Sequence, residues 1–144
     1  MKGGFNMQTF LPYYNFYNAL NCLDYKRLGK QRVEAKQILD ILLNRTPESH
    51  WRNHPAVKMW RGYEEVLKLY YNKSIILWKD RGYKNNMELE DFEINKFIVP
   101  PWLGDKQFHD SHKSNLLRKD PEFYGKYGWN VPNDLPYVWP EGKY

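Results

Sequence analysis

Carboxylates and amines that could cooperate in a reaction lie close together in residues 23–39, LDYKRLGKQRVEAKQIL. Asp24 or Glu34 could manage charge and protons, and the side-chain amine of Lys30 could attack a sugar carbon. Neighbouring cations favour the uncharged, nucleophilic form of a lysine. Lys30 could also contact a phosphate or simply face solvent, so the same residues suit either an enzyme or a binding module.

The four histidines form two pairs that could also contribute to a site. His50 and His54 flank the string WRN, and His109 and His112 share one face of an expected helix. With Asp110 beside them, His109 and His112 could bind a transition metal. Phosphate contact, proton transfer and structural hydrogen bonding are the other interpretations of these rings.

Several common kinds of site have no signature in the chain. Phosphate-binding loops, dinucleotide fingerprints and the strained serine turn of hydrolases are missing. Cys22 is the only cysteine, which excludes an internal disulfide and favours a reducing compartment. No apolar run is long enough to span a bilayer, and we expect an intracellular protein, in the cytoplasm or nucleoid, or in a host cell if it is viral.

The overall charge favours an anionic partner. The net charge is +5 and aromatic residues make up 17% of the 144 residues. Cations attract phosphates, and aromatic rings can stack on bases, although they also fill protein cores. Residues 23–39 combine both features, because the cations can occupy one helix face while Leu28, Val33, Ile38 and Leu39 turn inward. Nucleic acid is the leading candidate for the partner.

The elements that would position these residues are helices, and we expect an all-α, compact single-domain fold with three main helices. A short helix covers residues 16–23, and Asp24 caps a longer one that reaches about residue 43. A second long helix runs from Pro55 to Trp78 and ends at Gly82. Asp105 caps a third, which Pro121 closes, and the aromatic C-terminal segment is irregular.

Two further features concern local backbone. Gly29 interrupts the basic helix, which indicates either a kink or a close approach of another group. Residues 1–6 read as an N-terminal extension of a domain that spans residues 7–144, and Met7 is an alternative start.

The chain resembles the pyrimidine-dimer DNA glycosylase family, and a bacterial and viral branch of it most of all. Five strings carry the resemblance: MQTFLPY from Met7, LDYKRLGKQRVEAKQIL from Leu23, WRNHPAVKMWRGYEE from Trp51, WKDRGY from Trp78, and PPWLGDKQFHDSHKSNLLRKDPEFYGKYGW from Pro100.

The resemblance implies a compact helical enzyme that bends duplex DNA and flips a base. An N-terminal amine attacks the sugar C1′ to give an imine, a glutamate lies nearby, and elimination at the abasic site cuts the strand. No metal or other cofactor is needed. Flipping suits this chemistry because the glycosidic carbon is inaccessible inside stacked DNA.

The catalytic residues transfer only in part. Aligning the first helices puts Arg27, Leu28 or Gly29 at the family's glutamate, so Glu34 or Asp24 must supply the carboxylate. Lys2 and Gln8 are large residues that favour retention of a preceding methionine. The amine is therefore expected on Met1, on Met7 if synthesis starts there, or on Lys30.

Our leading hypothesis is a monomeric DNA-repair glycosylase with abasic-site lyase activity on damaged pyrimidines. The residues expected to contact DNA are Lys26, Arg27, Arg32, Arg52, His54, His109, His112, Lys113, Arg118 and Lys119. The alternatives are a non-catalytic module that binds distorted or modified DNA, a glycosylase acting on another base or on RNA, and an interaction protein with no nucleic-acid role.

Overall fold

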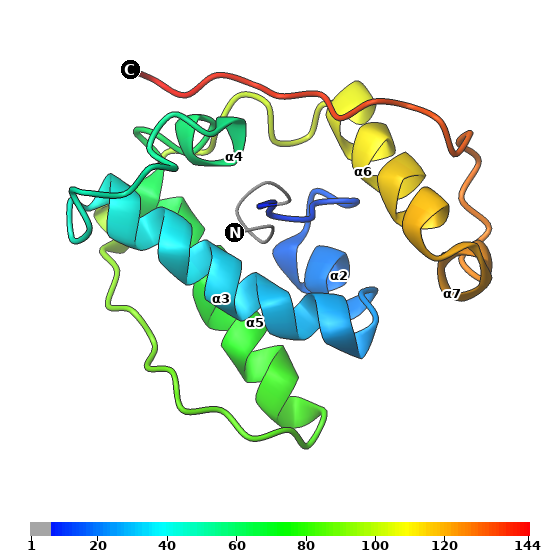
Figure 1. Cartoon of the computed structure of the whole chain (residues 1–144), viewed down its shortest axis with the longest axis horizontal. Helices are drawn as coiled ribbons and strands as arrows, with labels where there is room; N and C mark the ends of the chain where they lie inside the picture. Colours follow the sequence, from blue (N-terminus) through cyan, green and yellow to red (C-terminus); the bar gives the residue numbers. More distant parts are fainter. Residues whose placement is uncertain (1–6) are drawn as a thin grey trace.

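The computed structural model describes residues 7–144, which fold into helices joined by loops, with no β-strand among them (Figure 1). The elements are α2 (Phe16–Asn21), α3 (Tyr25–Leu42), α4 (Pro55–Lys58), α5 (Glu64–Asp80), the 3-10 helix η1 (Ile94–Lys96), α6 (Lys106–Lys119) and α7 (Pro121–Gly125). The predicted all-α class is confirmed. The predicted N-terminal extension, residues 1–6, lies outside the described residues. Within residues 7–144, no helix has both the length and the apolar character needed to cross a membrane.

Helix α3 carries the basic run and packs mainly on α5. Asp24 caps it as expected, its side chain accepting a hydrogen bond from the Arg27 N–H. The expected inward residues Leu28, Ile38 and Leu39 are fully buried. Val33 was expected inward too, but it is 46% exposed. It stands five residues from Leu28, and five steps of about 100° turn a side chain well away from the buried stripe.

The predicted helix from Pro55 to Trp78 is wrong in one respect, because it is two helices. Helix α4 ends at Lys58, and α5 begins only at Glu64. Between them Gly62 adopts a φ of +90°, which a helix cannot accommodate and which favours glycine. The C-terminal segment binds at this break, where the Lys143 N–H donates to the carbonyl of Arg61 at 2.8 Å.

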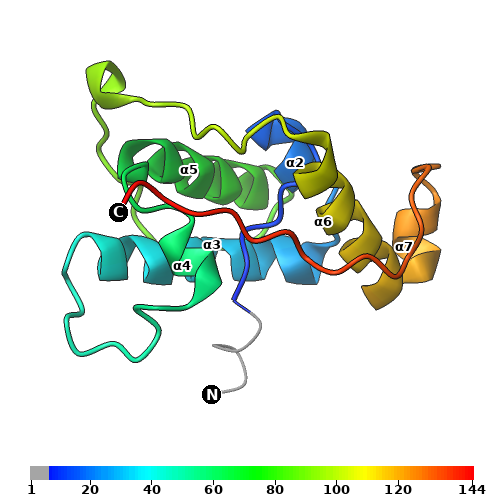
Figure 2. The same ribbon diagram turned by 90° about the horizontal axis from the view of Figure 1, so that it is seen from above.

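Residues 7–11 form a buried extended segment that passes between α3 and α6 (Figure 2). The segment has no strand partner, so helix side chains must satisfy its backbone polar groups. The bonds are Gln8 N–H to Glu34 Oε1 (3.0 Å), Phe10 N–H to Gln31 Oε1 (2.8 Å), Leu11 N–H to His112 Nδ1 (2.9 Å) and Tyr70 O–H to the Phe10 carbonyl (2.8 Å). Residues distant in sequence are thereby fixed around one short piece of backbone.

Helix α6 begins after its expected cap, Asp105, and ends before Pro121 as predicted. Pro121 also occupies the first turn of α7, a short helix that the sequence reading missed. Beyond α7 the chain is irregular, as expected, and runs back across α6 toward α4 (Figure 1). Ser114 and Ser111 of α6 accept backbone hydrogen bonds from Leu135 and Val138 and so hold this segment in place.

Candidate active site

Glu34 is a carboxylate that the fold buries almost completely. It lies on α3 with only 6% of its surface exposed. Its Oε1 accepts the backbone N–H of Gln8 at 3.0 Å, and its Oε2 lies 3.8 Å from the Nζ of Lys30, one helical turn away. A buried carboxylate is therefore held between the N-terminal segment and a cation at the surface.

This environment raises the pKa of Glu34 from 4.5 to about 7. Burial is the largest cause, because it penalises the charged form. The Gln8 N–H and the charges of Lys30 and Lys119 act in the opposite direction and limit the rise. Near neutral pH both protonation states of Glu34 are populated, which is the condition under which a carboxyl can both donate and accept protons.

A cavity of about 290 Å³ opens over Glu34. Its lining consists of Phe10, Lys26, Arg27, Lys30, Gln31, Glu34 and Lys119. Four of these residues are cations, and they come from the first half of α3 and the end of α6. Such a set can bind the phosphates on either side of a sugar while the carboxyl faces the sugar itself. Lys119 is perturbed as well, because burial and then the charges of Arg27, Arg118 and Lys30 lower its pKa.

Asp24, the other candidate carboxylate, has a different environment. It accepts a hydrogen bond from the Tyr124 hydroxyl and another from Arg27 Nη1 at 3.1 Å. Burial by itself would raise the pKa of Asp24, but these hydrogen bonds outweigh burial and lower it. Asp24 is thus an ionised helix cap and does not line the cavity, so Glu34 is the better candidate for proton transfer.

The candidate amines differ in how far they are exposed to solvent. The Lys30 side chain is 61% exposed at the rim of the cavity. Met7 is buried, with 1% of its surface exposed, and it immediately precedes Gln8, whose nitrogen is bonded to Glu34. The cavity thus brings together Glu34, Lys30 and the chain segment that starts at Met7.

The predicted DNA contacts divide into those at the cavity and those elsewhere. Lys26, Arg27 and Lys119 line the cavity. The Arg32 guanidinium instead covers the Trp78 ring at 4.5 Å and donates to Asn85 Oδ1 at 2.7 Å.

Arg118 donates to backbone carbonyls of the C-terminal segment, those of Asn133 and Leu135. Arg52 donates to the Pro47 carbonyl at 3.4 Å, and His54 Nδ1 caps α4 by accepting the Ala56 N–H.

His112 is a structural residue in this fold. It is 1% exposed, and its Nδ1 accepts the Leu11 N–H. Burial lowers the pKa of His112 to about 3, so the ring is neutral. A neutral, enclosed ring cannot reach a phosphate, which removes His112 from the DNA contacts that we expected.

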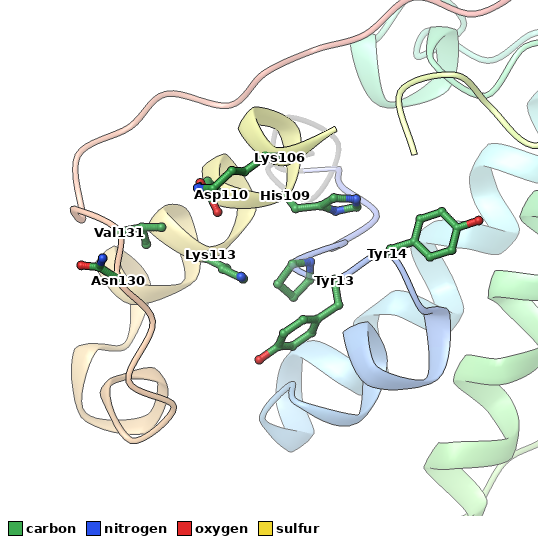
Figure 3. A pocket seen from close by; sticks show the side chains of 9 residues that line it. Tyr13, Tyr14, Lys106, His109, Asp110, Lys113, Asn130 and Val131 are labelled. Carbon is green, nitrogen blue, oxygen red and sulfur yellow. The ribbon is translucent and has the colours of Figure 1, made fainter. Parts of the chain in front are cut away.

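His109 and Lys113 line a second cavity, of about 450 Å³ (Figure 3). The His109 Nδ1 lies 2.7 Å from the Leu11 carbonyl, and the Lys113 Nζ lies 5.1 Å from the centre of the Tyr13 ring. Asp110 pairs with Lys106 at 2.5 Å. In residues 7–144 no group of three or more His, Cys, Asp or Glu side chains is placed to hold a metal ion.

The sequence reading missed Gln31 and Phe10. The Gln31 Oε1 accepts hydrogen bonds from the Phe10 N–H and, at 2.6 Å, from the Tyr70 hydroxyl, so Gln31 forms the rigid floor of the cavity. One signal was present: Gln31 precedes Glu34 by three residues and so shares its helix face.

The family model described as pyrimidine dimer DNA glycosylase matches residues 7–91, and the chain belongs to this family. The match includes α3 and Glu34 and stops before α6. No match is found among curated proteins or among solved structures. Family membership connects the chain with DNA repair and makes DNA its expected substrate.

Proposed function

We propose that this protein excises damaged pyrimidines from duplex DNA and then cleaves the abasic strand, with Glu34 as its proton-handling residue. The observation that supports this most is the buried Glu34 carboxyl, with a pKa of about 7, in a cavity bordered by four cations. The cations bind the phosphates beside the lesion, and the damaged nucleotide leaves the base stack to present its C1′ atom to the cavity.

Two bond changes define the first step. An amine nitrogen forms a bond to C1′ while the bond from C1′ to the base breaks, and the base departs with the electron pair and accepts a proton. The C1′–O4′ bond of the sugar ring then breaks as the nitrogen forms an imine with C1′, and O4′ keeps the electron pair and takes a proton from the nitrogen. In its protonated state Glu34 can supply a proton during this step, and it is then left as a carboxylate.

The carboxylate is suited to the second step. It removes a proton from C2′ of the imine, the electrons form a C2′–C3′ double bond, and the bond from C3′ to the phosphate oxygen breaks. The strand end leaves as a phosphate. Glu34 is reprotonated in this step, which returns it to its starting state.

The amine belongs to the segment that begins at Met7 when the chain starts there. The Gln8 nitrogen is 3.0 Å from Glu34 Oε1. In a chain that starts at Met7, the free α-amine is therefore one residue away from the nitrogen that is bonded to Glu34. In a chain that starts at Met1, the nitrogens of Met7 and Gln8 are amides and cannot form an imine. Lys30, at 3.8 Å from Glu34, is then the second candidate.

Borohydride trapping on a duplex with one abasic site tests the proposal, because borohydride reduces an imine to a stable adduct. A chain beginning at Met7 should give an adduct on its N-terminal peptide, and a chain beginning at Met1 should give much less. An adduct on Lys30 in both chains would support the lyase activity but assign the nucleophilic amine to Lys30. If neither chain gives an adduct while both bind the duplex, the enzyme proposal fails and a DNA-binding module remains.

A further inference from the structure

Four planar groups form a stack on one side of α3. The Arg32 guanidinium lies 4.5 Å from the centre of the Trp78 ring. Trp78 stacks on Tyr83 at 4.3 Å between ring centres, and Tyr83 stacks on Tyr25 at 5.9 Å, with interplanar angles of 24° and 23°. The stack joins α3 to the end of α5 and the turn that follows it.

Gly29 explains how the stack reaches α3. A Cβ atom added to Gly29 would lie 3.0 Å from two carbons of the Trp78 ring, closer than side chains normally pack. Helix α3 is continuous from Tyr25 to Leu42, so Gly29 marks a close approach and not a break. The Trp78 Nε1–H also donates to the Lys84 carbonyl at 2.8 Å, which fixes the indole in its plane.

The outer end of this rigid stack is open to solvent. Tyr25 is 51% exposed and Tyr83 is 40% exposed, whereas the Arg32 end is only partly exposed. Tyr25 is the first residue of α3 and is followed directly by Lys26 and Arg27, which line the Glu34 cavity. At about 100° per residue, Tyr25 and Arg32 lie on the opposite side of α3 from Glu34, and the exposed Lys26 lies between the two sides. The exposed aromatic ring and the cavity are therefore both reached from the side of α3 on which Lys26 lies.

We infer that Tyr25 is a stacking platform for an unstacked base of DNA whose phosphates are held by the cations of the Glu34 cavity. This inference rests on the proposed function, since it takes the same DNA as ligand. Nucleic acid is the occupant that fits, because it combines flat apolar faces with phosphates at regular spacing, and the stack combines an exposed ring with adjacent cations. A ring already fixed by its neighbours loses little conformational freedom when a base stacks on it.

The test compares the wild type with four variants by fluorescence anisotropy on a duplex with one abasic site. Tyr25→Ala should weaken binding by about 5- to 150-fold, the range that one base–aromatic stack provides. Tyr25→Leu, which keeps an apolar side chain but no ring, should show a similar loss even if Tyr25→Ala folds poorly. Tyr25→Phe keeps the ring and should bind within about twofold of the wild type.

Tyr144→Ala is the matched control. Tyr144 is 77% exposed, but its hydroxyl donates to Glu64 at the start of α5, whereas the stack lies at the other end of this 17-residue helix. The control should bind like the wild type. Loss of stacking should also leave the salt dependence of binding unchanged, because no charge is removed.

Unchanged binding by both Tyr25→Ala and Tyr25→Leu would overturn the inference, and so would an equal loss with Tyr25→Phe. These outcomes are separable from failure of the proposed function, which is read from the borohydride adduct of the chain that begins at Met7. If the adduct forms but the Tyr25 variants bind DNA as well as the wild type, the enzyme proposal stands and the stacking role of Tyr25 is rejected. If the wild-type protein does not bind the duplex, both proposals fail.

Discussion

Replacing Glu34 with glutamine should stabilise the folded chain above neutral pH. The pKa of Glu34 is about 7 in the fold against an ordinary value of 4.5, so its ionised form costs about 3 kcal/mol of folding free energy. Because the folded state holds this proton more tightly than the unfolded state, stability attributable to Glu34 falls as pH rises from 4.5 to 7. Above pH 7 the cost is constant.

Glutamine has the shape of protonated glutamate and keeps an oxygen for the Gln8 N–H, so it avoids this cost. The attraction of Lys30 is already included in this cost, because the charge of Lys30 is one of the causes that limit the rise of the Glu34 pKa to about 7. The expected net gain is about 3 kcal/mol at pH 8 and close to zero at pH 4.5.

Urea unfolding of both proteins, followed by far-UV circular dichroism at pH 4.5 and pH 8, measures this difference. Other groups that titrate, such as His112, are common to both proteins and cancel in the comparison. A Glu34→Gln protein that is no more stable than the wild type at pH 8 would refute the reasoning. A gain of equal size at both pH values would also refute it, because it could not come from the charge.

Three further predictions concern other parts of the molecule. His112→Leu leaves the Leu11 N–H without its acceptor and should cost about 2–3 kcal/mol of unfolding free energy at pH 7, measured by urea unfolding. The pKa of His112 is about 3 in the fold, so the wild type loses stability as pH falls from 6.5 toward 3, and the variant should lose less. Lys26→Met and Lys119→Met should each reduce the slope of log binding constant against log salt by about 1, and an unchanged slope would exclude that lysine from phosphate contact. Glu90→Gln weakens bonds from Arg45 at 2.8 and 3.0 Å and should cost about 1–2 kcal/mol, with faster hydrogen exchange in residues 84–93 and no change in DNA binding.

Local signals were sufficient for the helices whose ends carry their own caps. Asp24 and Asp105 each cap a helix where we expected one. The break between α4 and α5 was missed because apolar residues keep a helical spacing on both sides of Gly62. At the break Gly62 has a φ of +90°, and Lys143 contacts Arg61, a contact between residues so distant in sequence that it leaves no local pattern.

The same distinction applies to the candidate site. That Lys26, Lys30 and Glu34 share a face of one helix follows from their spacing. That Glu34 is buried and that Asp24 accepts a hydrogen bond from Tyr124 does not, because the N-terminal segment crosses α3 at Glu34 and Tyr124 reaches Asp24 from α7. The shared face of His109 and His112 was predictable as well, but not that it turns toward the backbone of Leu11.

Cleavage of an abasic duplex by the wild type, here the chain that begins at Met7, and by its Glu34→Gln variant, measured in single turnovers at pH 7, tests the central claim most directly. We expect the wild type to cut the strand, and the variant to bind the duplex within about threefold of the wild type but to cut it at least about 100-fold more slowly. A wild-type protein that binds and does not cut, or a variant that cuts as fast as the wild type, would contradict the role assigned to Glu34.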